Sequence, residues 1–409
     1  MVKPGYKQTD LGLLPEEWAC REIGSFADVC MCKRIFAEQT SEMGEIPFYK
    51  IGTFGKKADA YISRPLFEEY KQKYSYPQKG DVLISAAGTL GRTVVYDGEE
   101  AYFQDSNIVW LDIDKSQISN DYLYHYYKVI KWTPSEGSTI ARLYNGIITS
   151  TNVAVPPKPE QKAIAEALSD IDTLIVNLDK LIAKKEAVRN GTLQRMITGR
   201  VRLEGFSGEW VEINMAKHSK LKARIGWQGL TTSEYLSSGD AILVTGTDFC
   251  EGRVKWDSCH FVSWDRYQQD PNIQIVNGDV LLTKDGTIGK VALVDSLNRP
   301  ATLNSGVFVI RPLKNAYSSR FLYYVLASSV FQEFLDKLVA GSTIVHLYQK
   351  DLVAFEFMAP PTYEEQEAIA SVLYDMDGEI QMLKEKLGKY KLIKQGMMSE
   401  LFTGRMRLV

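Results

Sequence analysis

The stretch QKAIAEALSDIDTLIVNLDKLIAKKEAVRNGTLQRMITGRVRL, residues 161–203, decides the fold because the chain contains it twice. The second copy, QEAIASVLYDMDGEIQMLKEKLGKYKLIKQGMMSELFTGRMRL, covers residues 366–408 at a constant offset of 205 without a gap. Of the 43 aligned positions 16 are identical, including the closing Thr-Gly-Arg and Arg-Leu of each copy. Such a repeat indicates a duplicated unit.

The duplication extends upstream of these stretches. Gly80-Asp81-Val82-Leu83 returns as Gly278-Asp279-Val280-Leu281, and Gly88-Thr89-Leu90-Gly91-Arg92 returns as Gly286-Thr287-Ile288-Gly289-Lys290. Gly137-Ser138-Thr139-Ile140 returns as Gly341-Ser342-Thr343-Ile344, whereas the sequences between these anchors diverge. We therefore predict four segments: a globular domain over residues 1–157, a helix over 158–203, a second domain over 204–360 and a second helix over 361–409.

Each globular domain is predicted to mix strands and helices, which gives an α+β fold class. Short β-branched runs bounded by glycine are typical of strands, and longer segments with aromatic residues at helical spacing are typical of helices. The predicted strands are Val82–Ser85, Asn107–Leu111, Val280–Thr283 and Gly306–Ile310, and the predicted helices are Asp121–Lys131 and Ser319–Leu338.

The repeated stretch has apolar residues at alternating spacings of four and three, which is the heptad seam of a coiled coil. Prolines precede both copies, and Thr362 with Glu365 fits a capping box. The seam consists of Ile164, Leu168, Ile171, Ile175, Leu178 and Ile182 in the first copy, and of Ile369, Leu373, Met376, Ile380, Leu383 and Leu387 in the second.

Matched seams predict that the two helices pair with each other, although a lone helix could instead pack on its own domain. Two equivalent units related by an approximate two-fold axis would make the pair antiparallel. Helices of this length, at 1.5 Å per residue, would be roughly 50–60 Å long. That is longer than either domain needs for its own core, so we expect the helices to act as a spacer.

Composition and charge exclude several classes of protein. The net charge is −3, and segment by segment it is −3, +3, −2 and −1, so no segment is a basic arm. No apolar run approaches the roughly 18 residues of a membrane helix, and no signal peptide is recognisable, which predicts a cytoplasmic location. The five cysteines contain no CxxC pair, so we expect reduced thiols and no metal site.

Catalytic motifs are also missing from the sequence. The Pro-Pro pairs at 156–157 and 360–361 lack the Asn/Asp and aromatic neighbours of an amino-methyltransferase motif, and no phosphate-binding loop with the Walker A spacing occurs. The repeated glycine segments at 88–92 and 286–290 are interpreted as tight turns ending in a basic residue, or as contacts to phosphates or bases. We therefore expect a chain that is not itself an enzyme.

The layout of domain, conserved helix, domain, conserved helix resembles the specificity subunits of type I restriction-modification enzymes. The resemblance covers essentially the whole chain and rests on the ordered duplication of the motifs above. It implies that each domain reads one half of a bipartite, gapped DNA site. It also implies that the helices dock two methyltransferase subunits and, through them, the restriction subunits. S-adenosylmethionine, ATP and Mg²⁺ would be bound by those partners. The alternative is a coiled-coil scaffold that binds proteins without DNA specificity.

If the domains read DNA, the contacts are expected from basic or amide side chains in the divergent segments, since arginine usually reads guanine and asparagine or glutamine reads adenine. For each of them a solvated surface charge is the competing interpretation. The two Gly-Ser-Thr segments are interpreted as helix caps or phosphate-binding amides, and Asp170, Asp172, Asp375 and Asp377 as a solvated helix face or a docking surface. The candidate DNA contacts are Lys56, Lys57, Arg92, Arg224, Arg253, Lys255 and Lys290.

Overall fold

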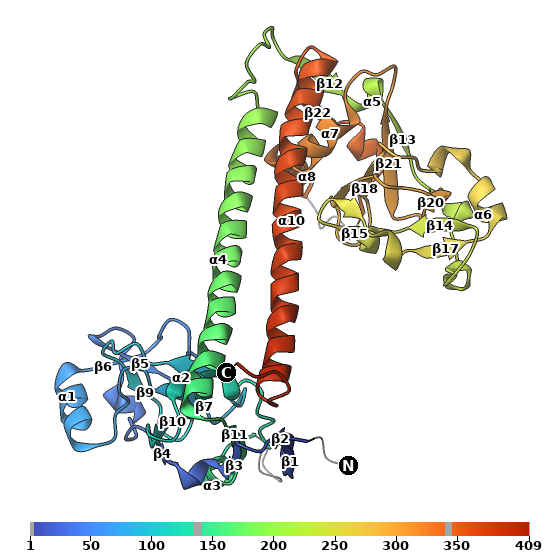
Figure 1. The fold of residues 1–409 in the computed structure, drawn as a ribbon. Helices are drawn as coiled ribbons and strands as arrows, with labels where there is room; N and C mark the ends of the chain where they lie inside the picture. Colours follow the sequence, from blue (N-terminus) through green and yellow to red (C-terminus); the bar gives the residue numbers. More distant parts are fainter. Residues whose placement is uncertain (1–3, 134–140, 340–345, 409) are drawn as a thin grey trace. The chain divides into compact units, whose positions relative to one another are not determined.

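The structure is a computed structural model that describes residues 4–133, 141–339 and 346–408. Internal contacts divide the chain into two compact units, residues 1–179 with 385–409 and residues 180–384. Each unit contains one globular domain and a part of both long helices, which Figure 1 labels α4 (Lys158–Ile197) and α10 (Tyr363–Leu401). Neither unit is therefore built from one repeat alone.

The domain of the first unit is built on two small sheets. One is antiparallel with the strand order β4-β10-β7-β8, which leaves β8 at an edge. The other has the order β6-β5-β9, with β9 parallel to β5. The pairs β1-β2 and β3-β11 complete it. The bounds are β1 Tyr6–Thr9, β2 Gly12–Pro15, β3 Ala19–Glu22, β4 Ala27–Cys30, β5 Ile46–Tyr49, β6 Tyr61–Ile62, β7 Val82–Ser85, β8 Thr93–Val95, β9 Tyr102–Phe103, β10 Ile108–Ile113, β11 Asn152–Val155, α1 Arg64–Lys73, α2 Asn120–Tyr126 and α3 Asn145–Thr149.

The domain of the second unit repeats this plan with a larger sheet, in the order β13-β21-β18-β19-β16-β15. Its smaller sheet is β17-β14-β20, and β12 pairs with β22. The bounds are β12 Val211–Asn214, β13 Ser219–Lys222, β14 Ala241–Val244, β15 Phe249–Cys250, β16 Arg253–Val254, β17 His260–Val262, β18 Val280–Thr283, β19 Val291–Leu293, β20 Ala301–Leu303, β21 Val307–Pro312, β22 Glu356–Ala359, α5 Met215–His218, α6 Trp264–Gln268, α7 Ser319–Leu326, α8 Ser329–Val339 and α9 Gln349–Leu352.

The central strand of each domain lies between two hydrophobic clusters. In β7, Val82 and Ile84 face one cluster and Leu83 faces the other, because successive side chains of a strand point to opposite faces. In β18, Val280 and Leu282 are separated from Leu281 in the same way. Burial on both faces explains why these strands are uninterrupted apolar runs.

Two predicted helices are shorter in the structure than the sequence pattern indicated. The helix predicted over 121–131 ends at Tyr126, where the backbone N–H groups of Lys128 and Val129 bond three residues back rather than four. The helix predicted over 319–338 is divided into α7 and α8. The hydroxyl of Ser328 accepts a hydrogen bond from the N–H of Val330 at 3.2 Å, which starts a new helix. The predicted strands are confirmed within two residues at each end.

Within the first unit, the start of α4 packs against the end of α10. Ile164 and Leu168 share a buried cluster with Leu401 and Phe402. Lys394, which lies one heptad beyond Leu387, the last residue of the second seam, donates a hydrogen bond to Asp172. Partners late in one helix and early in the other mean that the helices are antiparallel.

Within the second unit, the start of α10 packs against the end of α4. Ile369 and Leu373 of α10 lie in one cluster with Leu193 and Ile197 of α4. Arg189, which lies 205 residues before Lys394, binds Asp377 at 2.7 Å. The predicted antiparallel coiled coil is confirmed in both units. Eight seam residues are buried, and Ile175, Met376, Leu383 and Leu387 are half-buried.

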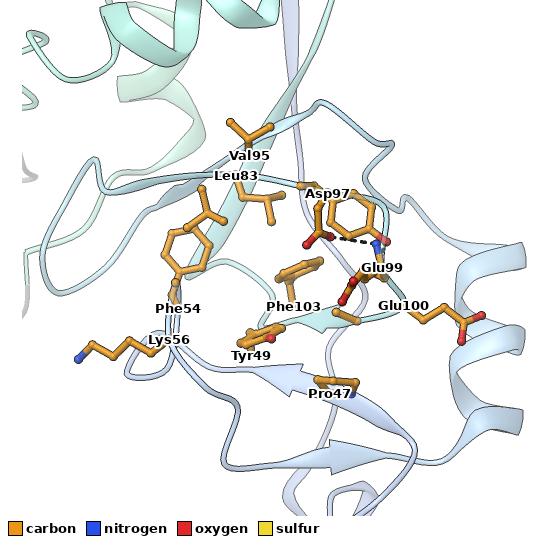
Figure 2. Close-up of a pocket in the computed structure, with 14 residues that line it drawn as sticks. Pro47, Tyr49, Phe54, Lys56, Leu83, Val95, Asp97, Glu99, Glu100 and Phe103 are labelled. Carbon is orange, nitrogen blue, oxygen red and sulfur yellow. Dashed lines mark hydrogen bonds between the residues drawn. The ribbon is translucent and has the colours of Figure 1, made fainter. Parts of the chain in front are cut away.

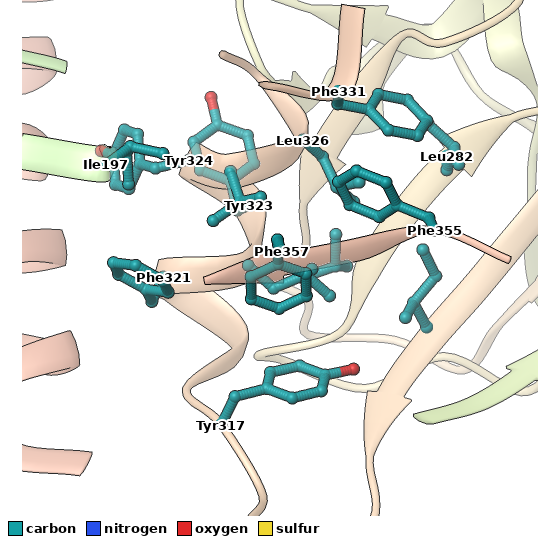
Figure 3. Packing of buried hydrophobic residues seen from close by; sticks show 14 of the residues in the cluster. Ile197, Leu282, Tyr317, Phe321, Tyr323, Tyr324, Leu326, Phe331, Phe355 and Phe357 are labelled. Atoms are coloured by element: carbon teal, nitrogen blue, oxygen red, sulfur yellow. The ribbon is translucent and has the colours of Figure 1, made fainter. Parts of the chain in front are cut away.

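Aromatic packing anchors the helix ends to the second domain, as Figure 3 shows for residues around α7 and β22. The rings of Phe331 and Phe355 meet edge to face with centroids 5.1 Å apart. Ile197, the last residue of α4, belongs to this same cluster. Since buried aromatic side chains contribute much of a core's stability, the helix end is an integral part of the domain.

A buried carboxylate at the start of each long helix binds an arginine that follows the other long helix. The side chain of Glu160 is fully buried and accepts hydrogen bonds from Arg407 Nε at 2.5 Å and Nη2 at 2.9 Å. Trp18 Nε1 donates to the same carboxylate at 2.8 Å. The hydrogen bond to Glu160 raises the pKa of Arg407.

The second unit contains the same pair at an offset of 205. Arg202 Nε and Nη2 donate to the two oxygens of Glu365 at 2.9 and 2.6 Å. Thr362 caps α10 through the N–H of Glu365 at 3.3 Å, as predicted, but the Glu365 side chain binds Arg202 instead of completing the capping box.

Residues close to the two ends of the described chain also meet in the first unit. The Tyr6 hydroxyl donates to the carbonyl oxygen of Gly404 at 2.8 Å. Gly404 has φ +62, and a Cβ there would lie 2.4 Å from Pro15 Cγ, so only glycine fits. The C-terminal residues are thus built into the N-terminal domain.

Replacing Glu160 by Gln should lower the free energy of unfolding by about 2–3 kcal/mol, because it removes the charge that compensates the partly buried Arg407. Chemical denaturation of the full-length chain measures this loss. Glu166→Gln is the matched control, since Glu166 is exposed and forms an ion pair with Lys162 one turn away at 3.7 Å. Equal effects of the two variants would show that the buried pair is not a main source of stability.

His125 makes the first unit sensitive to acid. Its Nε2 lies 3.0 Å from Ser169 Oγ, and its side chain is 1% exposed. Burial, and then the charge of Lys128, lower the pKa of His125 to about 4 from its ordinary 6.5. Between these values the unfolded chain binds a proton that the folded chain does not, so stability is complete above pH 6.5 and falls as the pH falls towards 4.

We expect His125→Gln to remove up to about 3 kcal/mol of this pH dependence, because a shift of one pKa unit corresponds to about 1.4 kcal/mol. The measurement is the free energy of unfolding at pH 7 and pH 4.5 for both proteins. If the two proteins lose the same stability on acidification, the titrating group lies elsewhere.

Candidate nucleic-acid interface

A tight turn with a basic residue at its end follows the central strand of the second domain. The Thr283 hydroxyl donates to the carbonyl oxygen of Thr287 at 2.6 Å and accepts from the N–H of Lys290 at 2.9 Å. Gly286 and Gly289 have φ +66 and +84, which glycine adopts without strain. The side chain of Lys290 is exposed.

The first domain builds the same turn with different side chains. The Ser85 hydroxyl donates to the carbonyl oxygen of Thr89 at 2.5 Å and accepts from the N–H of Arg92 at 2.8 Å. The predicted tight turns are therefore confirmed in both domains. Their contact with DNA stays a prediction. The Gly-Ser-Thr segments at 137–139 and 341–343 lie outside the described residues.

In the first domain, the candidates Lys56, Lys57 and Arg92 gather around one loop. Arg92 Nη1 donates to the carbonyl oxygen of Phe54 at 2.9 Å, and its guanidinium lies 6.0 Å from the centre of the Phe54 ring. Lys56 and Lys57 follow on the same loop and are exposed (Figure 2 shows Lys56). Arg92 thus fixes the backbone that carries the two lysines.

The second domain presents a pocket of about 400 Å³ beside its glycine turn. Most of the lining residues come from three segments, after β14, at the turn and before β21, and Tyr235 together with His260 of β17 completes the lining. Hydroxyl, amide and ammonium groups of this kind form hydrogen bonds to base edges and phosphates. The polar ones include Thr245, Thr247, His260, Thr287, Lys290 and Asn304.

Asn304 is held in place for such a contact. Its Oδ1 accepts a hydrogen bond from the N–H of Gly306 at 3.0 Å, and the side chain is half-buried. Asn304, Thr245 and Thr247 were not among the predicted contacts, because about 60 residues separate them in the sequence and only the fold brings them together. The sequence signal that could have pointed to these residues is that they lie in segments where the two repeats differ.

Three further candidates of the second domain have different environments. Lys255 is exposed, whereas Arg253 binds the Asp295 carboxylate and its guanidinium lies 4.9 Å from the centre of the Tyr374 ring. Arg224 is 1% exposed, so its guanidinium is inaccessible to DNA in this structure. Arg224 Nε donates to the carbonyl oxygen of Leu303 at 2.9 Å, and burial lowers the pKa of Arg224.

The acidic residues beside the seam divide into two kinds. Asp170 and Asp375 are exposed, as a solvated face predicts. Asp172 binds Lys394 and Asp377 binds Arg189, so both belong to the helix pair. Burial opposes ionisation of Asp172, but the hydrogen bond from Lys394 outweighs it and lowers the pKa of this carboxyl.

We next consider metal-binding and nucleophilic side chains in the part of the chain that the structure describes. No group of three or more His, Cys, Asp or Glu residues there could hold a metal ion. Burial raises the pKa of Cys32 and of Cys259 to about 12, which keeps both thiols protonated at neutral pH. Within the described residues no helix combines the length and apolarity needed to cross a membrane.

Comparison with known families decides the class of protein. Residues 15–187 and 233–390 both match the family model described as the type I restriction modification DNA specificity domain. The chain belongs to this family of specificity subunits. The two matched stretches correspond to the two internal repeats, each with its globular domain and a part of its long helix.

Two similar proteins are also specificity subunits by name. A putative type I restriction enzyme specificity subunit of Haemophilus influenzae is 60% identical over 153 residues, which cover 37% of this chain and 40% of that protein. The putative MjaX specificity subunit of Methanocaldococcus jannaschii is 22% identical over 425 residues, covering 98% of this chain and 97% of that protein.

Solved structures of the family share the fold. The crystal structure of a type I restriction-modification S subunit from M. genitalium aligns with a TM-score of 0.63 at 17% identity, covering 98% of this chain and 99% of that one. A chain from a study of assembly and conformational transition of the type I system aligns with a TM-score of 0.54 at 14% identity, covering 96% of this chain and 99% of that one.

Lys290→Ala in this specificity subunit should weaken binding to all DNA sequences alike and reduce the slope of log affinity against log salt by about one, since one phosphate contact is lost. Fluorescence anisotropy of labelled duplexes over a range of salt concentrations measures both effects. Lys217→Ala, an exposed lysine on α5, is the control. An unchanged slope would place Lys290 away from the phosphates.

Proposed function

We propose that this chain selects the DNA sequence for a type I restriction-modification enzyme. Each globular domain reads one half of a bipartite, gapped site, and the order of the domains makes the site asymmetric. The chain supplies the choice of sequence and carries out no chemistry itself.

One observation carries this proposal: the two domains share a scaffold and differ in the segments that surround the repeated turn. The same hydroxyl-braced turn presents Arg92 in one domain and Lys290 in the other. Around it, the first domain places the loop with Lys56 and Lys57, and the second places the threonine-rich pocket. A constant frame with different contact residues suits a pair of domains that read different half-sites.

The long helices are proposed to set the distance between half-sites. At 40 and 39 residues, α4 and α10 each extend about 60 Å at 1.5 Å per residue. Half-sites one helical turn of DNA apart are separated by about 34–36 Å. A helix pair of this length, lying obliquely to the duplex, has the reach for such a spacing.

Docking of partner subunits completes the proposal. Two methyltransferase subunits are proposed to bind the helices, and the restriction subunits to bind through them. S-adenosylmethionine, ATP and Mg²⁺ then belong to those partners, which act on DNA in the cytoplasm. The net charge of −3 supports a division of labour in which partners provide much of the phosphate contact.

Exchanging residues 1–157 for the equivalent domain of another specificity subunit should change one half of the methylated motif and leave the other half and the gap unchanged. Inserting about four residues, one helical turn, near Lys184 should change only the gap. The measurement is single-molecule sequencing of methylated adenine in cells that co-express the methyltransferase subunit.

The wild-type chain with its methyltransferase subunit is the reference, and the methyltransferase subunit alone is the control. A gapped motif that disappears without this chain supports the proposal. A motif that changes in both halves after the exchange would contradict modular reading. Absence of any motif, with the complex still formed, would overturn the proposed function.

A further inference from the structure

The two domains differ at the outer edge of their larger sheets. In the second domain, β19 is flanked by β16, which runs parallel to it and pairs Arg253 with Leu293. In the first domain, the equivalent strand β8 pairs with β7 on one side, and no strand of the described chain pairs with it on the other. The equivalence is exact in register, because Val82 pairs with Val95 as Val280 pairs with Leu293.

A difference in segment length causes this asymmetry. Pro47 pairs with Tyr61 in the first domain, and Ile242 pairs with Phe261 in the second, so the intervening segments span 14 and 19 positions. The five additional residues of the second domain allow the hairpin β15-β16. The first domain lacks the residues to make this hairpin.

In the second domain the hairpin makes three kinds of contact. The N–H of Leu293 donates to the carbonyl oxygen of Gly252 at 2.9 Å, which continues the sheet. Arg253 binds the Asp295 carboxylate, and Trp256 Nε1 donates to the Asp295 carbonyl oxygen at 3.0 Å. Val254 is buried in the core beneath. Backbone, charge and aromatic contacts thus act together.

The first domain has a pocket at the corresponding place. Its volume is about 300 Å³. Leu83, Phe54 and Phe103 are among the apolar residues that line it (Figure 2). Asp97, at the position of Asp295, lies on its rim with Glu99 and Glu100. All three are exposed, and because Glu100 binds Arg64 at 3.0 Å, the acidic part of the rim consists of Asp97 and Glu99.

The open strand beside the pocket is itself apolar. The Val95 side chain is 44% exposed, at the position where Leu293 is 6% exposed beside the hairpin. An exposed apolar edge strand is a template for pairing with another chain, and proteins usually protect such edges.

We propose that β8 and this pocket bind an extended segment of a partner protein, which adds a strand parallel to β8. The segment carries a basic residue followed three positions later by an aromatic one, as Arg253 precedes Trp256 in the second domain. The basic group binds Asp97 and the acidic rim, and the aromatic ring enters the pocket. Strand addition of this kind combines backbone hydrogen bonds for affinity with side-chain pockets for specificity. The inference is independent of the DNA-reading proposal.

The probe is a fluorescein-labelled peptide, Gly-Arg-Val-Lys-Trp-Asp-Ser, which copies residues 252–258 of this chain. Fluorescence anisotropy with the full-length protein should show saturable binding. Asp97→Lys should weaken it by about tenfold or more, since like charges then face each other. A peptide with alanine in place of tryptophan should bind as weakly.

Val95→Pro tests the strand itself. It removes the edge N–H, and proline is tolerated on edge strands where that N–H faces outward. Binding should be lost while thermal unfolding stays close to wild type. Asp112→Lys, an exposed acid two strands away on β10, is the charge-matched control and should leave binding unchanged.

Two results would overturn the inference. Absence of saturable binding to the folded wild-type chain would remove the docking site. Peptide binding that survives Val95→Pro but is displaced by free indole would show a pocket for small aromatic molecules and no strand addition.

Discussion

The rest of the structure depends on the pairing of a buried glutamate with an arginine from the other repeat. Glu160 and Arg407 close the first unit, and Glu365 and Arg202 close the second. A buried carboxylate is tolerated only when hydrogen bonds satisfy it, and each of these receives two from a guanidinium. The start of one long helix is thereby tied to the residues that follow the other. The core of each domain includes residues from the two helix ends that its ion pair holds together, so the pairing of the repeats shapes both domains.

The pairing of each helix start with the end of the other helix explains why some residues of the heptad seam also belong to the domain cores. Ile164 and Leu168 are seam residues by spacing, yet they are buried in a cluster that also contains Trp18 and Phe402. A coiled coil in water contributes stability through one narrow stripe, whereas here its two ends are enclosed by globular packing. Farther from the helix ends, Ile175 and Leu387 are half-buried, and the ion pair of Asp172 with Lys394 adds a polar contact to the seam. Helix pairing and domain folding are in this sense one process.

The sequence alone was sufficient for the repeat, the seam, the glycine turns and the class of protein, because each of these is a local pattern that occurs twice. It was insufficient where the outcome depends on distant partners. Arg224 is of a residue type that often contacts DNA, but it is buried and bonds the carbonyl oxygen of Leu303, about 80 residues away in the sequence. The break at Ser328 depends on one side-chain hydrogen bond within an otherwise helical pattern. The pocket around Asn304 and Thr245 joins segments that only the fold places side by side, and the open edge of β8 becomes visible only by comparing the two domains in register.

The C-terminal residues that complete the N-terminal domain impose an order on synthesis. Domains of a growing chain generally fold as units with the N-terminal one first. Here Leu401, Phe402 and Arg407 leave the ribosome after the whole second domain, and the first domain's core and its buried carboxylate both depend on them. The second unit, which ends at residue 384, is complete earlier. A product that stops before Leu401 therefore has its defect in the domain that was synthesised first, where a quality-control protease would meet an incomplete core.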